Sequence, residues 1–439
     1  MGGKKTAKIT IPIHQDSFFL SVEFTEQHIN VRQRTTMEKH PFAELVTEGT
    51  TKIVFLIMDG LGGVQIKEKG GTELQVAKTP NLDQLASESI CGLLDPISPG
   101  ISPGSGPAHF GLFGYDPVAF SIGRGILEAA GIDFPLTAND VVARINFCTV
   151  DKNGIITDRR AGRIDTQDNI RICEKVEKNI KKHPRLDEVL VKPVKEHRAV
   201  VVLRGRDLHG DIEDTDPQKT GLKPLPPKAV NKESEEAAGI AADFLDQVSR
   251  ILSDEPKANM MLLRGFAKHR KYSSMLERYK LNAVAIAAYP MYKGISRLLG
   301  MEVLDNITGI AEEFTALKNN FLKYDFFFIH IKPTDSRGED GDFDAKVKAI
   351  EEVDSYIPQV LGLKPDVLVV TGDHSTPALL KGHSWHPVPV LLYSACCRFD
   401  AVTKFDEISC IQGGLGRMDS VHLIWVALAN ANRLAKFGA

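Results

Sequence analysis

The sequence of 439 residues has little of what marks several protein classes. Its six cysteines show no Cys-x-x-Cys spacing, which argues against a disulfide framework and against a zinc ribbon. No stretch reaches about 18 consecutive apolar residues, so we expect no membrane-spanning helix. The net charge of −3 offers no electrostatic footprint for nucleic acid or an anionic membrane. We therefore expect a cytoplasmic protein that binds neither.

Common phosphate-binding and hydrolase signatures are also missing. No Gly-x-x-x-x-Gly-Lys-Ser/Thr motif occurs, and the glycine-rich segment GISPGSGPAHFGLFGYDP (100–117) lacks the spacing of a dinucleotide-binding loop. Its PGSGP core is not the Gly-x-Ser-x-Gly of a nucleophile elbow either. The segment does place Ser105 between two glycines and before a proline, which predicts a tight turn that presents a hydroxyl. Alone, such a cluster is usually a plain loop.

Three apolar runs that are typical of buried strands lead into candidate metal ligands. KIVFLIMDG ends at Asp59, DVLVVTGDHSTP contains Asp373 and His374, and YDFFFIHIKPTDSRGEDGD contains Asp335 and Glu339. Open α/β sheets bind their ligands just beyond the carboxyl ends of strands, so we expect these side chains to share one site. Carboxylates, imidazoles and a hydroxyl suit Mn²⁺ or a similar divalent ion.

Each signal also has an ordinary structural explanation. An aspartate after a strand is often only a turn former, and the segment with Asp335 and Glu339 is typical of a solvated, charged loop. His383 and His386 in KGHSWHPVP resemble half of a zinc site, but no second pair or cysteine accompanies them. Either histidine remains a candidate loop ligand. The hypothesis of a metal site therefore rests on the combination of carboxylates, histidines and a hydroxyl, and not on any one of them.

The pattern of elements predicts an α/β fold interrupted by an insertion. Apolar strands that are followed by candidate metal ligands occur within residues 45–122 and 299–439. Residues 123–298, which separate these segments, lack this pattern. We predict a core domain built from the two outer segments and a smaller inserted α/β domain. Residues 1–44 are assigned to an N-terminal extension and lead-in, of which 1–36 have no expected catalytic role.

The predicted insertion carries arginines near the ends of apolar runs. They are Arg159, Arg160 and Arg163 in DRRAGRID, Arg204 in VVVLRGRD and Arg264 in MLLRGF. The planar guanidinium binds phosphate and carboxylate groups with two hydrogen bonds. A single arginine is usually a surface charge, but several in one domain indicate an anion pocket.

Taken together, the motifs resemble one family. MDGLGG, TPNLD, PGSGPAHFGLFGYDP, RGILEA, DRRAGR, YPMYKG, TDSRGEDGD, GDHSTP and HSWHPVP are similar to those of the archaeal-type, 2,3-bisphosphoglycerate-independent phosphoglycerate mutases of the alkaline phosphatase superfamily. The resemblance runs from about residue 45 to the end of the chain. It implies an alkaline-phosphatase-like core sheet with a smaller inserted α/β domain, and a glycolytic and gluconeogenic isomerase. Its substrate is a small molecule, phosphoglycerate, and no bisphosphoglycerate is needed.

The resemblance also assigns roles to residues. It implies that Ser105 is the phosphorylated nucleophile and that the core binds two divalent ions, first of all Mn²⁺, with Mg²⁺, Co²⁺ or Zn²⁺ as alternatives. One ion is held by Asp59, Ser105, Asp373 and His374, and the other by Asp335, Glu339 and His383. Bacterial mutases have a histidine where Glu339 stands. The substrate-binding candidates are Arg159, Arg160, Arg163, Arg204, Arg264 and Lys293.

Three other functions remain open at this point. A metal-dependent phosphatase or another phosphomutase of the same superfamily would share the metal–serine core, and the arginines of the insertion favour the mutase over both. A non-catalytic binding protein with a degenerate site is the alternative from a different class. The presence of Asp59, Ser105, Asp373 and His374 argues against it.

Overall fold

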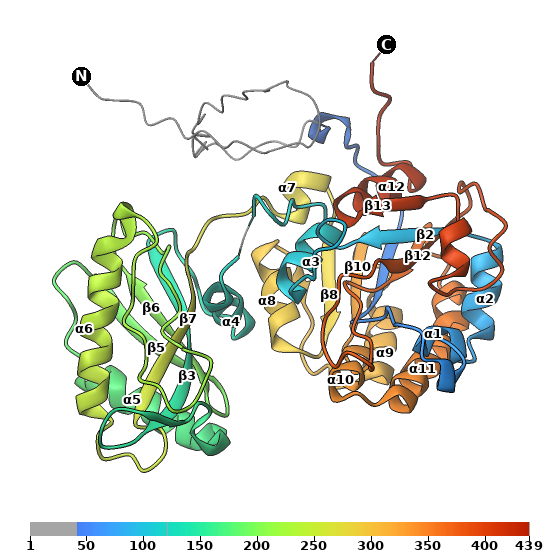
Figure 1. Ribbon diagram of the computed structural model, residues 1–439. Coiled ribbons are helices and arrows are strands. Elements are labelled where there is room, and N and C mark those ends of the chain that lie inside the picture. The colour runs from blue at the N-terminus through green and yellow to red at the C-terminus, as the bar shows by residue number, and fades with distance from the viewer. Residues whose placement is uncertain (1–41, 121, 439) are drawn as a thin grey trace, which may run out of the picture. The chain divides into compact units, whose positions relative to one another are not determined.

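Two separate sheets organise the chain (Figure 1). The structure, a computed structural model, describes residues 42–120 and 122–438, so the predicted leader 1–36 lies outside the described residues. The order of the larger, eight-stranded sheet is β13-β2-β12-β11-β1-β10-β8-β9, and β3 to β7 form the smaller sheet. The predicted mixed α/β class is confirmed. Among the described helices, none is long and apolar enough to cross a membrane.

The larger sheet has a parallel and fully buried centre. Its strands are β1 (Ile53–Met58), β2 (Ile90–Asp95), β8 (Ala283–Ala287), β9 (Glu302–Val303), β10 (Phe326–Ile331), β11 (Val367–Thr371), β12 (Val388–Ser394) and β13 (Gly416–Asp419). β1 lies between β10 and β11 and runs parallel to both, whereas β12 is antiparallel to β11 and β2. The continuous apolar runs of β1, β10 and β11 suit a sheet that is covered on both faces.

Helices cover both faces of this sheet. They are α1 (Glu73–Val76), α2 (Pro80–Ser87), α3 (Ser105–Leu112), α7 (Met275–Tyr279), α8 (Pro290–Leu298), α9 (Ile310–Asn320), α10 (Pro333–Asp340), α11 (Phe343–Gly362) and α12 (Leu423–Asn430). Successive strand residues point to opposite faces. Accordingly, Leu56 belongs to an apolar cluster with α2, α9 and α11, and Phe55 to one with α3, α8 and α12.

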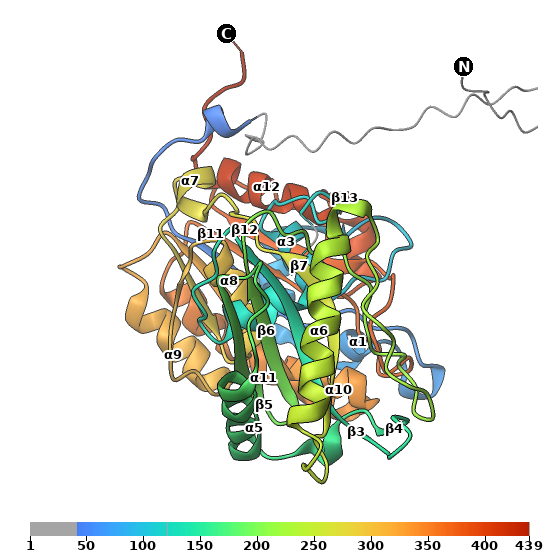
Figure 2. The same cartoon turned by 90° about the vertical axis from the view of Figure 1, so that its left-hand side faces the viewer.

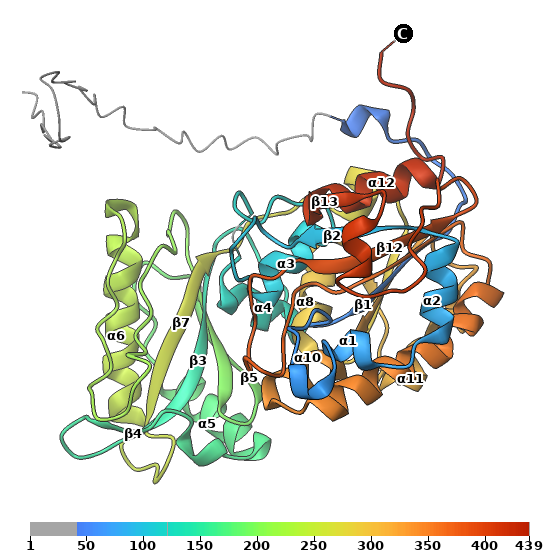
Figure 3. The same ribbon diagram turned by 45° about the vertical axis from the view of Figure 1, so that its right-hand side comes forward.

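The smaller sheet is antiparallel. It consists of β3 (Asp140–Val150), β4 (Ile156–Asp158), β5 (Glu188–Lys195), β6 (Arg198–Arg204) and β7 (Met260–Lys268). Figure 3 shows β3 and β7 side by side. One face is packed against α5 (Thr166–Asn179) and α6 (Glu235–Ile251), and Figure 2 shows α6 in front of the sheet. The opposite face contacts α4 (Arg124–Gly131) through Val142, Val200 and Val202.

The smaller sheet ends earlier than the predicted insertion. β8 lies within residues 123–298, yet it pairs with β10 in the larger sheet. The chain therefore leaves the smaller sheet after β7, and the predicted boundary at residue 298 does not coincide with the division between the sheets. The short run AVAIA (283–287) is too brief to separate a core strand from an insert strand by its pattern alone.

Candidate active site

Three parallel strands deliver the predicted ligands to one edge of the larger sheet. Asp59 follows β1 directly, Asp373 comes two residues after β11, and Asp335 lies in the first turn of α10, just beyond β10. Gly60 makes this convergence possible, because its φ is +65° and a Cβ there would lie 2.8 Å from Oδ1 of Asp335. The structure thus brings together the residues that strand ends predicted.

Ser105 is the first residue of α3 and not part of a free turn. Gly104 is the N-cap, and Pro107 is tolerated because it lies in the first turn, where backbone N–H groups lack helical partners. The Oγ of Ser105 lies 3.3 Å from Nε2 of His374. The start of a helix carries unpaired N–H groups and partial positive charge, which favours a phosphoryl group at this hydroxyl.

The first group of candidate metal ligands is Asp59, Asp373 and His374, whose ligand atoms all lie within 4.8 Å of one another. All three side chains are buried. Oδ1 of Asp59 and Oδ2 of Asp373 have no hydrogen-bond partner among the described residues. Nε2 of His374 lies 3.3 Å from the first oxygen and 3.2 Å from the second. Buried, unpaired carboxylate oxygens beside an imidazole nitrogen fit a divalent cation.

Thr376 fixes His374 in the form that can bind a metal. Its single hydroxyl proton is donated to Oδ1 of Asp335, at 2.6 Å. Oγ1 of Thr376 also lies 3.0 Å from Nδ1 of His374, so Nδ1 must carry a proton and donate it to that hydroxyl oxygen. Nε2 then offers its lone pair toward Asp59 and Asp373.

The electrostatics of this group favour a bound cation. Burial and the neighbouring Asp59 raise the pKa of Asp373 well above its usual value. Burial also opposes ionisation of Asp59, but Lys332 and His330 outweigh it and lower that pKa. Burial lowers the pKa of His374, which keeps the imidazole neutral. A cation between the two carboxylates would relieve their repulsion.

The second group is Asp335, His374 and His383, again within 4.8 Å. Nδ1 of His383 is 2.9 Å from the carbonyl oxygen of Pro103, so it donates there and leaves Nε2 free to bind a cation. This Nε2 lies 3.7 Å from Asp335 and 3.9 Å from Glu339. Asp335 and Glu339 are one turn apart on α10, where the sequence had predicted a loop. Glu339 is thus in reach of the second group.

Lys332 is a site residue that the sequence analysis missed. Its Nζ lies 3.0 Å from Oδ2 of Asp59 and 2.5 Å from Oδ2 of Asp335, so an ammonium bridges the two ligand groups. Tyr292 on α8 donates a hydrogen bond to the same Oδ2 of Asp59, at 2.5 Å. Nδ1 of His109 on α3 lies 3.3 Å from Asp373. Nothing in the local pattern of these residues indicates that they converge from separate elements.

Several predicted substrate residues are already paired with carboxylates. Arg159 makes two hydrogen bonds to Asp216, and Arg204 makes two to the buried Asp140 and one to Glu188. Arg160 and Arg163 are exposed, and Lys293 is half-buried on α8. The substrate role of these residues stays a prediction.

Another arginine cluster, which includes the predicted substrate residue Arg264, lies on the face of the smaller sheet that contacts α4. Arg144 on β3 is the cross-strand partner of Arg264 on β7, and Asn146 is the partner of Arg198 on β6. Burial lowers the pKa of Arg144, and so do Arg198, Arg124 and Arg264. The alternation of Val142, Arg144 and Asn146 in the run VVARINF could have revealed this polar face.

Acidic groups only partly balance this arginine cluster. Oε1 of Glu128 lies 3.5 Å from Arg144 and 4.0 Å from Arg198. Arg264 is within 3.4 Å of both Asp214 and Asp216. Within the part of the chain that the structure describes, Glu128 is the one carboxylate within 4.0 Å of Arg144 and Arg198, so this pair retains capacity for an anion.

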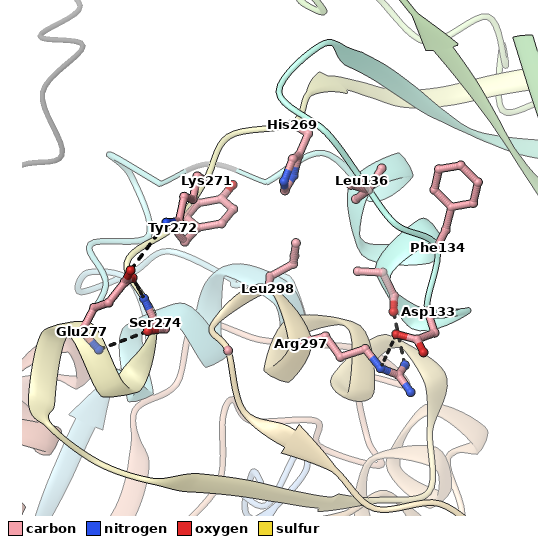
Figure 4. A pocket seen from close by; sticks show the side chains of 12 residues that line it. Asp133, Phe134, Leu136, His269, Lys271, Tyr272, Ser274, Glu277, Arg297 and Leu298 are labelled. Carbon is pink, nitrogen blue, oxygen red and sulfur yellow. Dashed lines mark hydrogen bonds and ion pairs between the residues drawn. The ribbon is translucent and has the colours of Figure 1, made fainter. Parts of the chain in front are cut away.

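A cavity of about 320 Å³ lies elsewhere (Figure 4). Asp133, Phe134 and Leu136 line it from the segment between α4 and β3, and His269 and Tyr272 from the segment after β7. It contains none of the candidate metal ligands, so we do not assign it to the reaction.

Known proteins identify the family. A sequence profile of 2,3-bisphosphoglycerate-independent phosphoglycerate mutases matches residues 86–258. A probable mutase of this kind from Thermosipho africanus is 49% identical over 399 residues, which cover 90% of this chain and 98% of the relative. A probable mutase from Thermus thermophilus is 47% identical, with coverage of 90% and 98%. The chain belongs to the 2,3-bisphosphoglycerate-independent phosphoglycerate mutase family.

Solved structures agree with this assignment. A cofactor-independent phosphoglycerate mutase from Thermoplasma acidophilum is 29% identical, with a TM-score of 0.66 and coverage of 87% of this chain and 100% of that one. A protein from Pyrococcus horikoshii is 29% identical, with a TM-score of 0.76 and coverage of 89% and 100%. The family implies divalent metal ions, which the donor atoms of the two ligand groups fit.

Proposed function

We infer that this protein interconverts 3-phosphoglycerate and 2-phosphoglycerate without bisphosphoglycerate, through a phosphoserine at Ser105. The observation that carries this proposal is the combination of the Ser105 site with an arginine cluster on the neighbouring sheet. A phosphatase needs only the first. The mutase must also hold glycerate while the phosphoryl group is on the enzyme, and a carboxylate matches the guanidinium groups of Arg144, Arg198 and Arg264.

Tyr289 connects the two parts of the proposed site. The charge of Arg198 interacts with its side chain, and Nζ of Lys332 lies 5.4 Å from the centre of its ring. A substrate with its phosphoryl group near Ser105 and its carboxylate at Arg198 would therefore pass Tyr289. This contact supports a single continuous binding site.

The proposed cofactors are two divalent ions, with Mn²⁺ favoured by the mixture of carboxylate and imidazole ligands. Asp59, Ser105, Asp373 and His374 would hold one ion, and Asp335, Glu339 and His383 the other. When bound, such ions neutralise phosphoryl oxygens and lower the pKa of a coordinated hydroxyl. Asp59 and Asp335 also hold the ammonium of Lys332, which adds a fixed positive charge for the same oxygens.

The chain's own residues then account for the transfer. The Oγ of Ser105 loses its proton and forms a bond to phosphorus as the bond to the glycerate oxygen breaks, and that oxygen takes up a proton. The arginines keep glycerate bound while it turns. Its other hydroxyl loses a proton and accepts the phosphoryl group as the bond to Ser105 breaks, and the Oγ of Ser105 takes up a proton again, so no proton or phosphate is gained or lost overall. Movement of the smaller domain would exclude water during this step.

We place this reaction in the cytoplasm, with phosphoglycerate as the partner. All six cysteines are free, as suits a reducing compartment.

A product assay tests the proposal. The protein is incubated with 3-phosphoglycerate and Mn²⁺, with no bisphosphoglycerate present, and both 2-phosphoglycerate and free phosphate are measured. We expect 2-phosphoglycerate to be the main product. Release of free phosphate without 2-phosphoglycerate would identify a phosphatase, and absence of both products would leave only a binding protein.

A further inference from the structure

Lys346 is a fully buried cation beneath the candidate metal ligands. It lies on α11, at a position of the helix that otherwise packs apolar residues such as Phe343 and Ile350 into the core. Its side chain has 0% exposure. Lysine is almost never fully buried unless it is paired, so this position requires a specific role.

Each of the three ammonium protons of Lys346 has a backbone acceptor. Nζ lies 2.8 Å from the carbonyl oxygen of Gly60, 3.1 Å from that of Gly62 and 2.8 Å from that of Thr376. Gly60 and Gly62 belong to the loop after Asp59, and Thr376 to the loop after His374. One side chain from a third element therefore ties the two ligand-bearing loops together.

Two buried glutamates complete this arrangement. Glu73 on α1 accepts a hydrogen bond from the N–H of Ala378, at 2.7 Å, and Glu407 accepts one from the N–H of Gly63, at 2.8 Å. Burial lowers the pKa of Lys346, and the attraction of both nearby carboxyl groups opposes this effect. The loops that follow Asp59 and His374 are thus held by a buried lysine and two buried glutamates. None of these three residues belongs to either group of candidate metal ligands.

We propose that Lys346 is a positioning residue that sets the spacing of loops 59–63 and 373–378 before a divalent ion binds. It acts on the affinity of the site for the ion through the backbone, without touching substrate. The proposal rests on the proposed function to the extent that the two ligand groups hold divalent ions. An ammonium suits this task because its three donors fan out, whereas the planar guanidinium of arginine cannot copy that geometry.

The test measures Mn²⁺ binding to metal-free protein by the paramagnetic resonance signal of the free ion. Residues that orient metal ligands typically change metal affinity by about 10- to 100-fold when replaced, so Lys346→Met should raise the Kd for Mn²⁺ by that factor. The visible absorption spectrum of the Co²⁺ form should change as well. At saturating Mn²⁺ the KM for 3-phosphoglycerate should stay close to that of the wild type.

Lys348→Met is the matched control, because Lys348 is exposed two residues further along the same helix. It should leave the Kd, the spectrum and the KM unchanged. A folded Lys346→Met protein with wild-type Mn²⁺ affinity and Co²⁺ spectrum would overturn the proposal. If that variant does not fold, Lys346→Gln, which keeps an amide donor, is measured in its place. Failure of both to fold would also overturn it, because Lys346 would then hold the domain as a whole.

The outcome can be separated from that of the proposed function. Mn²⁺ affinity is measured without substrate or turnover. A wild-type protein that binds Mn²⁺ but makes no 2-phosphoglycerate would refute the mutase and leave the comparison of Lys346 variants intact.

Discussion

Arg144 and Arg264 face each other as cross-strand partners on β3 and β7. Like charges directly opposite one another destabilise a sheet. Arg264 approaches Asp214 and Asp216, while Glu128, at 3.5 Å, is the one carboxylate within ion-pair distance of Arg144 among the described residues. This pair of like charges lowers the stability of the sheet. Its presence is explained if an anionic substrate binds between the two guanidinium groups.

Replacing Arg144 by glutamine should therefore weaken the mutase reaction. Loss of a charge-assisted contact costs on the order of 1.5 to 3 kcal/mol, which is about ten- to a hundred-fold in kcat/KM. Because glycerate would escape before the return transfer, the share of free phosphate among the products should rise. The measurement is the ratio of free phosphate to 2-phosphoglycerate formed by the wild type and by the variant.

Arg204→Gln is the matched comparison, because the guanidinium of Arg204 is engaged by the buried Asp140. It should lower the free energy of unfolding by roughly 1.5 to 3 kcal/mol and leave the product ratio unchanged. If Arg204→Gln changes the ratio and Arg144→Gln does not, the substrate pocket has been assigned to the wrong arginines.

Ser105→Ala should abolish phosphoryl transfer while the protein stays folded. Ser105 is partly exposed at the start of α3 and caps no helix, so only a hydroxyl is lost. Without the nucleophile there is no covalent route, and turnover should fall by orders of magnitude. Thermal unfolding checks the fold. Turnover close to the wild type in this variant would exclude Ser105 as the phosphoryl carrier.

Removal of divalent ions should reversibly inactivate the protein. The ligand groups contain carboxylates and imidazoles, so a chelator should stop turnover, and Mn²⁺ or Co²⁺ should restore it. Elemental analysis before and after treatment confirms removal and reloading. Full activity in protein shown to contain no metal would contradict the assignment of both groups.

Glu313 should make stability depend on pH. Burial in α9 raises its pKa to about 9, and Oε2 has no hydrogen-bond partner among the described residues. The folded-state pKa lies above the unfolded value of about 4.5. The contribution of Glu313 to the free energy of unfolding is therefore complete below pH 4.5 and falls as the pH rises toward 9. Glu313→Gln avoids this loss, so it should raise the Tm at pH 8 by roughly 2 °C or more and have little effect at pH 4.

Glu312→Gln serves as the control for this effect, because Glu312 is the exposed neighbour on the same helix. Its Tm should follow that of the wild type at both pH values. A Glu313→Gln protein that is no more stable than the wild type at pH 8 would show that Glu313 is already ionised at little cost.

The part of the site that lies at strand ends could be predicted from the sequence. Asp59 and Asp373 follow short, continuously apolar runs, and the geometry of a parallel sheet brings such positions to one edge. The fold class followed from the same runs. Ser105 was found as an exposed hydroxyl, although the structure places it at the start of a helix because Gly104 can act as its N-cap.

The remaining residues depend on contacts between distant segments. Lys332 reaches Asp59 only because β10 lies beside β1, and Tyr292 does so from α8. The arginine cluster needed the register of β3, β6 and β7, which local pattern does not supply. Lys346 would be expected on a solvated helix face, and only the packing of α11 reveals its burial.

The central claim is that Ser105 returns the phosphoryl group to the glycerate from which it came. A crossover experiment tests it most directly. 3-Phosphoglycerate with heavy oxygen in its phosphoryl group and deuterium in its glycerate is mixed with unlabelled 3-phosphoglycerate, and the 2-phosphoglycerate formed early in the reaction is analysed by mass spectrometry. The account predicts that the two labels stay together, with no bisphosphoglycerate added. Product in which the labels are mixed at random would contradict it, because glycerate would then leave before the phosphoryl group returns.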